Sequence, residues 1–153
     1  MTKILMLAIV FLIGSSCSPE EQMNGETVMR EVRTMLGEYE ASIERGGLMA
    51  EFAFLDSSDD FFWVPPGFSS ALSYDSVRAI VSLNAQNTRS ISMSWDTLRI
   101  VPLSGSLAAY TGVLSWRSAD TTGVESRTKL IETGVAVRRE DGWKLLCGQT
   151  RNP

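Results

Sequence analysis

The hydrophobic period of this 153-residue chain changes near Ser90, and this change limits the folds that the chain can adopt. Before Ser90, apolar residues recur every three or four positions, which is the spacing of an amphipathic helix. After Ser90, apolar and polar residues alternate, which is the spacing of a strand with one buried face. Helices followed by antiparallel strands are typical of an α+β fold, in which the helices cover one side of a sheet.

The part before Ser90 predicts one long helix, two shorter helices and a short strand. The long helix begins near Gly25 and ends at Gly46-Gly47, and its apolar stripe consists of Val28, Val32, Met35, Leu36, Tyr39 and Ile43. The second helix spans residues 48–55, and an aromatic strand over residues 61–64 is stopped by Pro65-Pro66-Gly67. Ser73 is a suitable N-cap for the third helix, one side of which is formed by Val77, Ile80, Val81 and Asn84.

The part after Ser90 predicts four longer antiparallel strands joined by tight turns at residues 103–106, 120–123 and 140–142. In the first strand, the alternating apolar phase shifts after Trp95, which predicts a bulge or bend near Thr97. The other strands show alternating sets of Ala108, Tyr110, Gly112, Leu114 and Trp116, then Ile131, Thr133, Val135 and Val137, then Trp143, Leu145 and Cys147.

The first residues have the order of a bacterial signal peptide. Lys3 supplies a positive start, residues 4–13 are an unbroken apolar run, and Gly14-Ser15-Ser16 stands directly before Cys17. The apolar run is shorter than the roughly 20 residues that cross a bilayer. A cysteine after small residues resembles the lipobox of bacterial lipoproteins, although Gly14 stands where a leucine is common.

This pattern divides the chain into three parts. We expect residues 1–16 to be a signal peptide, residues 17–24 a lipidated Cys17 with a polar tether, and residues 25–153 the folded domain. The protein is then an exported lipoprotein of the cell envelope, held to a membrane by its lipid anchor, and Ser18 favours the outer membrane. Ordinary cleavage after Ser16, which leaves a soluble periplasmic or secreted protein, is the alternative.

The composition excludes several kinds of chemistry. The chain has no histidine, which removes the commonest general base and the commonest metal ligand. The net charge is −4 and the basic residues are dispersed, so no nucleic-acid partner is expected. Lipidation of Cys17 leaves Cys147 as a small buried hydrophobe, whereas a Cys17–Cys147 disulfide is the alternative if the leader is not cleaved.

Several short motifs, taken in their order, resemble the SnoaL-like branch of the nuclear-transport-factor-two-like superfamily. They are the segment 61–67, Tyr110-Thr111-Gly112, and the final hairpin over residues 133–145 with its Asp141-Gly142-Trp143 turn. The resemblance covers residues 25–151 and implies a cone: a curved antiparallel sheet wrapped around the long N-terminal helix, with two shorter helices and a pocket at the open end. Members include isomerases, dehydratases, cyclases and binding or dimerisation modules, so the fold leaves the function open.

Six residues are candidates for the wall of this pocket, namely Tyr39, Trp63, Tyr110, Trp116, Glu132 and Gln149. The aromatic candidates combine an apolar surface with a polar group, and the competing interpretation is that they are plain core residues. Glu132 is out of phase with its apolar neighbours, so we expect it to face solvent, with a pocket base as the alternative. Gln149 either hydrogen-bonds a ligand or belongs to a solvated rim.

No catalytic residue, metal or cofactor is assigned. Relatives often carry histidines near the positions of Cys147 and Gln149, and the lack of histidine excludes the histidine-dependent dehydratase chemistry of some members. Asp56, Asp59 and Asp60 lack the spacing of a calcium-binding loop and predict a solvated acidic turn.

Three functions follow from these observations. The favoured one is a non-catalytic domain that binds a small apolar or amphipathic molecule. A protein-interaction module, in which a homodimer forms through an exposed Trp95 or Trp116, is the second. An isomerase-like enzyme that uses a pocket carboxylate and a tyrosine is the third, and it requires a buried carboxylate with a raised pKa.

Overall fold

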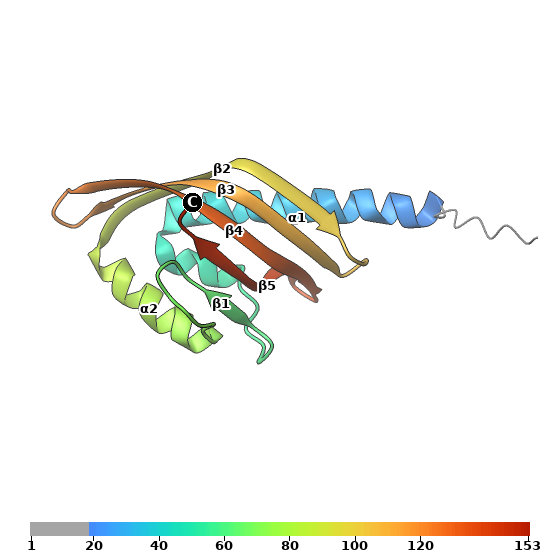
Figure 1. The fold of residues 1–153 in the computed structure, drawn as a ribbon, viewed down its shortest axis with the longest axis horizontal. Helices are drawn as coiled ribbons and strands as arrows, with labels where there is room; N and C mark the ends of the chain where they lie inside the picture. The colour runs from blue at the N-terminus through green and yellow to red at the C-terminus, as the bar shows by residue number, and fades with distance from the viewer. Residues whose placement is uncertain (1–18) are drawn as a thin grey trace, which may run out of the picture.

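The computed structural model describes residues 19–153, with side chains from Asn24 onward, and shows helices packed on one side of a curved sheet (Figure 1). The predicted α+β architecture is confirmed, with helices first and long strands after them. The elements in chain order are α1 (Pro19–Gly46), the 3₁₀ helix η1 (Leu48–Ala53), β1 (Phe62–Val64), α2 (Tyr74–Asn87), β2 (Thr88–Pro102), β3 (Leu107–Asp120), β4 (Glu125–Arg139) and β5 (Gly142–Arg151).

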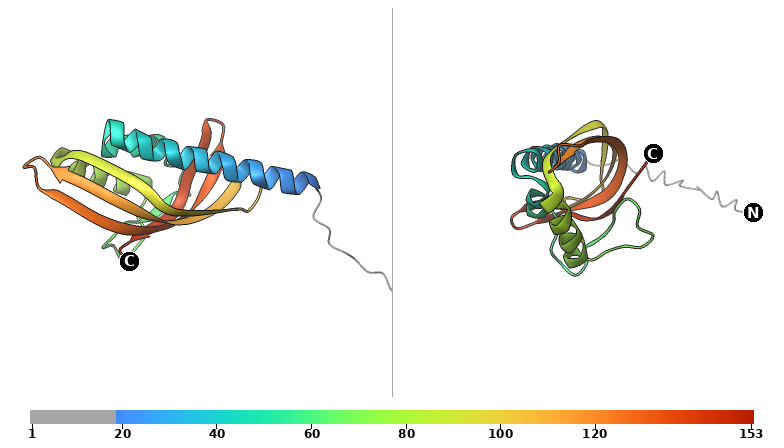
Figure 2. Two further views of the ribbon diagram at one scale, coloured as in Figure 1. Left: turned by 90° about the horizontal axis from the view of Figure 1, so that it is seen from above. Right: turned by 90° about the vertical axis from the view of Figure 1, so that its left-hand side faces the viewer.

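The five strands form one sheet in the order β1-β5-β4-β3-β2. Strands β2 to β5 are antiparallel neighbours, whereas the short β1 runs parallel to β5. The predicted bulge is confirmed, because the β2–β3 register shifts between Trp95 and Thr97. A second shift in the β4–β5 pairing lies between Val135 and Ala136. Such bulges bend a sheet, and Figure 2 shows the long strands curling around α1.

Helix α1 packs its apolar stripe into the concave face of the sheet (Figure 2). All six residues predicted for that stripe are buried: Val28, Val32, Met35, Leu36, Tyr39 and Ile43. The predicted start near Gly25 was wrong, because the helix begins at Pro19 and includes most of the segment predicted as a tether. Proline suits the first position of a helix, where its missing N–H costs no hydrogen bond.

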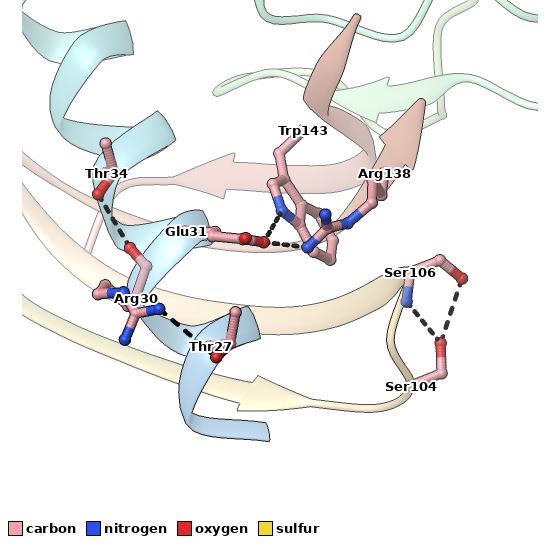
Figure 3. A network of polar contacts seen from close by, with 8 residues as sticks. All are labelled: Thr27, Arg30, Glu31, Thr34, Ser104, Ser106, Arg138 and Trp143. Atoms are coloured by element: carbon pink, nitrogen blue, oxygen red, sulfur yellow. Dashed lines mark hydrogen bonds and ion pairs between the residues drawn. The ribbon is translucent and has the colours of Figure 1, made fainter. Parts of the chain in front are cut away.

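A polar network ties α1 to the last two strands (Figure 3). Glu31 on α1 accepts hydrogen bonds from the Trp143 indole (3.0 Å) and from the Arg138 guanidinium. The same guanidinium lies over the Trp143 ring, with its carbon 5.0 Å from the ring centre. The network therefore fixes the middle of α1 to the final hairpin.

Helix α2 packs against η1, β1 and β2. The predicted cap is confirmed, because the Ser73 hydroxyl accepts a hydrogen bond from the Ser76 amide. Within residues 19–153, no helix has both the length and the hydropathy that a membrane span requires. The proposed signal peptide and Cys17 lie outside the described residues.

Candidate functional site

A cavity of about 610 Å³ lies between the concave face of the sheet and the helices. Its walls are mostly apolar and come from α1, η1, α2 and strands β1 to β5. The side of α2 that the sequence predicts, formed by Val77, Ile80, Val81 and Asn84, lines one wall. The volume falls within the range of about 300–1,000 Å³ that is typical of sites for small molecules.

Four of the six residues predicted for the pocket line this cavity: Tyr39, Trp63, Trp116 and Glu132. Tyr110 is not among the lining residues; it is only 2% exposed and hydrogen-bonds to Glu132. Gln149 is exposed and pairs with Thr133, whereas its neighbour Thr150 is buried and lines the cavity.

Glu132 is the centre of a buried hydrogen-bond network. The Tyr110 hydroxyl donates to its Oε1 at 2.9 Å, and the Thr150 hydroxyl donates to its Oε2 at 3.2 Å. The Trp63 indole N–H in turn donates to the Thr150 hydroxyl at 3.0 Å. Each partner of the carboxylate is an uncharged donor, so no cation in this network neutralises the carboxylate.

The expectation that Glu132 faces solvent was wrong, since its side chain is only 4% exposed. Strand register gives the reason: Glu132 is paired with Gly112 on one side and Thr150 on the other, and paired residues share a face of the sheet. That face is the concave one. The apolar residues Ile131 and Val135, which suggested the opposite phase, lie on the outer face, where the half-buried Val113 accompanies them.

Three glycines on the concave face make room for aromatic rings. A Cβ on Gly134 would lie 3.0 Å from the Tyr110 hydroxyl oxygen, and a Cβ on Gly148 would lie 2.8 Å from the Trp63 ring. A Cβ on Gly112 would meet the Trp95 ring at 2.7 Å. The glycines thus allow Tyr110 and Trp63 to lie flat enough along the sheet to take part in the network around Glu132.

Glu51 is a second carboxyl group in the cavity wall. Burial and then the charge of Glu132 raise its pKa to about 7, although a bond from the Tyr39 hydroxyl opposes the change. Glu51 is not among the pocket residues predicted from the sequence. A signal was present, because Glu51 stands three residues after Leu48 and four before Leu55, on the apolar side of its short helix.

Glu132 also has a raised pKa, of about 7. Burial is the cause, and the hydrogen bonds from Tyr110 and Thr150 reduce the shift without cancelling it. The pKa values of Tyr39 and Tyr110 lie well above the ordinary value, first because both are buried and then because carboxylates lie nearby. Both phenols therefore keep their protons at neutral pH and can serve as hydrogen-bond donors.

Asp56 differs from the prediction of a solvated acidic turn. It is 6% exposed and accepts bonds from Arg139 Nε (3.2 Å), Arg139 Nη2 (2.6 Å) and the Ser58 hydroxyl (2.7 Å). Its role is to join the loop after η1 to the end of β4. Among residues 19–153, no group of three or more acidic or cysteine side chains is arranged to hold a metal ion.

Trp95 and Trp116 do not form the exposed patch that the interaction hypothesis requires. Trp116 lines the cavity, and Trp95 packs edge-to-face on Tyr110 with ring centres 6.1 Å apart. Both belong to the concave side of the sheet.

Cys147 is half-buried, and burial raises the pKa of its thiol, which disfavours the reactive thiolate form.

The sequence matches no protein-family model and no curated protein. Solved structures do match the fold. A candidate dehydratase of the nuclear transport factor 2-like family from Streptomyces avermitilis is 20% identical, with a TM-score of 0.71 over 84% of this chain and 98% of that one. A candidate scytalone dehydratase from Novosphingobium aromaticivorans is 13% identical, with a TM-score of 0.75 over 86% of this chain and 88% of that one.

A third solved structure is a candidate calcium/calmodulin-dependent protein kinase II association domain from Xanthomonas campestris. It is 15% identical, with a TM-score of 0.70 over 95% of this chain and 98% of that one. The chain has the nuclear transport factor 2-like fold. At these identities the likeness establishes the fold alone, and this fold places a ligand-sized cavity against the concave side of its sheet.

Proposed function

We propose that this nuclear transport factor 2-like domain binds a small molecule in the cavity. The observation that carries the proposal is an apolar cavity of about 610 Å³ whose wall includes a buried, hydrogen-bonded carboxyl group. The apolar wall favours a ligand with a hydrocarbon body, because burial of that body releases water. Glu132 and the Tyr39 hydroxyl offer polar contacts that orient the ligand.

A pair of tryptophan variants on helix α2 tests this proposal. Val81 is half-buried and lines the cavity, whereas Leu83 on the same helix is 63% exposed and is not a lining residue. We expect the fluorescence of the neutral probe N-phenyl-1-naphthylamine to rise when it binds the purified protein. Val81→Trp should weaken this binding at least tenfold, and Leu83→Trp should leave it unchanged. Equal binding by both variants would place the probe elsewhere.

A second candidate function is acid–base catalysis, and the pKa of about 7 for Glu132 favours it. In its ionised form Glu132 can accept a proton from a carbon next to a carbonyl group, while the Tyr39 hydroxyl turns from Glu51 to donate its hydrogen bond to the carbonyl oxygen. The sequence predictions include this chemistry as an isomerase-like alternative. The test is the exchange of the α-hydrogens of 2-tetralone with deuterium, followed by NMR, in the wild type and in Glu132→Gln. Equal exchange rates would exclude Glu132 as the base.

We further propose that the domain is tethered to the cell envelope, in the outer membrane, through a lipid on Cys17. Support comes from the order of the first residues, in which a positive start, an apolar run and small residues precede the cysteine. In a bacterial host fed an alkyne-tagged fatty acid, we expect the wild type to carry the label. Cys17→Ser should be unlabelled, and a labelled Cys17→Ser protein would contradict the assignment.

Two copies of the domain are proposed to associate through the outer face of the sheet. The support is the half-buried apolar side chains of Val113, Ile131 and Val135 on that face, together with the solved association domain that has the same fold. Sedimentation should show a dimer for the wild type and a monomer for Ile131→Lys. A wild type that is monomeric at every accessible concentration would remove this proposal.

A further inference from the structure

The charged residues that line the cavity are all acidic. They are Glu51 and Glu132, with Asp120 at the β3–β4 turn, and no lysine or arginine of the described chain lines the cavity. Asp120 already accepts three hydrogen bonds within its own turn, from the Thr122 amide and hydroxyl and from the Val124 amide. Those bonds, all to Oδ1, hold Asp120 in the turn, whereas Glu132 is 4% exposed and its charge acts directly on Glu51, so Glu51 and Glu132 are the carboxyl groups of the inner cavity wall.

This charge distribution discriminates between classes of ligand. An anionic ligand would add a negative charge beside the half-buried Glu51 and the buried Glu132, without a cation to pair with it. A neutral ligand would leave the carboxyl groups as they are. A ligand with a positive charge would supply the counter-ion that the cavity lacks, in surroundings where water screens charges weakly.

The aromatic side chains of the cavity also suit a cation. Tyr39, Trp63 and Trp116 lie in the wall. Faces of such rings attract ammonium groups, and their edges and the neighbouring aliphatic side chains accommodate a hydrocarbon body. The cavity thus combines an acidic group at one place with apolar and aromatic surface around it.

We propose that the ligand of this cavity is an amine with an apolar or aromatic body, bound as its ammonium form with Glu132 and Glu51 as counter-ions. The inference rests on the proposed ligand-binding function of the cavity and names the chemical class of the ligand. Glu132 accepts one hydrogen bond on each oxygen from its uncharged partners, and a carboxylate oxygen has capacity for a further donor.

Binding of an ammonium ion has a consequence for protons. The titratable groups that act on Glu132 from the packed elements are Tyr39 of α1, Glu51 of η1 and Tyr110 of β3; Thr150 of β5 is uncharged. Because the pKa values of both glutamates are raised to about 7, the pair holds protons at neutral pH. An ammonium ion favours the ionised forms, so its binding should release protons and should tighten as the pH rises from 6 to 8.

Three probes of nearly the same shape test the proposal: 2-phenylethylamine, 2-phenylethanol and phenylacetate. Titration calorimetry with the whole purified protein at pH 6 and pH 8 gives the affinity of each. We expect the amine to bind at least tenfold more tightly than the alcohol, and the phenylacetate to bind most weakly. Repeating the amine titration in buffers of different ionisation enthalpy should show net proton release at pH 6.

Charge-neutral variants assign the effect to the cavity. Glu132→Gln and Glu51→Gln should each reduce the affinity for the amine at least fivefold more than they reduce the affinity for the alcohol. Glu44→Gln, which removes one charge from an exposed position on α1, should change neither affinity. A loss of amine binding in the Glu44 variant that equals the loss in the Glu132 variant would show an effect of net charge only.

The outcomes separate this inference from the proposed function beneath it. If the alcohol or the phenylacetate binds as tightly as the amine, and Val81→Trp abolishes that binding, the cavity binds ligands but the amine assignment is wrong. If no probe binds in a manner sensitive to Val81→Trp, the proposed function fails and the amine assignment fails with it.

Discussion

Asp56 and Glu132 are both buried carboxyl groups, with 6% and 4% of their surface exposed, yet their pKa values move in opposite directions. Burial raises the pKa of Asp56, but hydrogen bonds and charge from Arg139, with a bond from Ser58, outweigh burial and lower it. Burial raises the pKa of Glu132 to about 7, and the hydroxyl groups of Tyr110 and Thr150 only reduce that shift.

The difference lies in the partner of each carboxylate and not in the degree of burial. A guanidinium carries the opposite charge and two parallel N–H donors, so Asp56 is ionised at neutral pH and serves as a structural link. Hydroxyl groups provide hydrogen bonds but no charge, so Glu132 stays close to its titration point beside an open cavity. A carboxyl group in that condition can bind a cation or exchange a proton, whereas Asp56 already has its cation.

The largest expected effect is on how stability depends on pH. Because the pKa of Glu132 is higher in the folded protein than the usual value of 4.5, the folded state binds more protons between those values, and stability falls as the pH rises from about 4.5 to 7. Glu132→Gln removes this loss. We therefore expect its free energy of unfolding, relative to the wild type, to increase by on the order of 2 kcal/mol between pH 5 and pH 8.

Urea denaturation at a series of pH values measures this difference. Asp56→Asn is the matched control, because its lowered pKa has the opposite sign of linkage. The stability from Asp56 is present above pH 4 and is lost as the pH falls through its lowered pKa, so the difference between this variant and the wild type should be constant from pH 5 to pH 8. Parallel pH profiles for the wild type and Glu132→Gln would show that Glu132 does not titrate in this range.

The next effect concerns the amount of stability that Asp56 supplies at pH 7. Asp56→Asn keeps the shape of the side chain but removes the charge that pairs with Arg139, and we expect it to lower the free energy of unfolding by about 1.5 kcal/mol. Chemical denaturation at pH 7 measures the loss. At pH 3 the loss should shrink, because the pKa of Asp56 is lowered only in the folded protein, and the stability that its charge supplies is lost as the pH falls from the ordinary value of 3.8 through the lowered one. An unchanged loss at pH 3 would contradict the assignment to charge pairing.

The sequence predicted the frame of the molecule better than its site. Local periodicity was sufficient for the stripe of α1, for the cap at Ser73 and for the bulge near Thr97, because each depends on neighbours in the chain. The resemblance supplied the curved sheet and the pocket, which periodicity cannot determine. Four of six pocket candidates line the cavity. Three of them are aromatic, and large aromatic side chains on the predicted concave face are buried against the cavity.

The polar part of the site depends on contacts that a single strand does not reveal. Glu132 was expected to face solvent because Ile131 and Val135 on either side are apolar, yet those residues form the outer face. Its true phase follows from pairing with Gly112 and Thr150, which lie 20 and 18 positions away in the chain. Asp56 was assigned to a solvated turn for the same reason, since Arg139 is distant in the sequence.

Glu132 and Asp56 each accept a hydrogen bond from a hydroxyl group, that of Thr150 and that of Ser58, and removal of each hydroxyl tests the comparison further. Thr150 donates to Glu132 and accepts from the Trp63 indole, so Thr150→Val leaves Oε2 of Glu132 and the indole N–H of Trp63 each without a partner. We expect a loss of about 1 kcal/mol at pH 7 and a further rise in the pKa of Glu132. Thr150→Ser should restore both. NMR of the Glu132 carboxyl carbon against pH measures the pKa, and a pKa unchanged by Thr150→Val would remove Thr150 from the network.

The smallest effect on stability should come from Ser58, whose hydroxyl donates to Asp56. Ser58 donates to Asp56 at 2.7 Å, but Ser58 is only half-buried, and Arg139 already supplies two donors to the same carboxylate. Water can replace the lost hydroxyl there, so Ser58→Ala should cost less than about 0.5 kcal/mol in the free energy of unfolding. The same denaturation assay measures both hydroxyl variants. If Ser58→Ala lowers the free energy of unfolding as much as Thr150→Val does, Asp56 depends on its uncharged donor as Glu132 does. The charge of Arg139 would then not explain the difference between the two carboxyl groups.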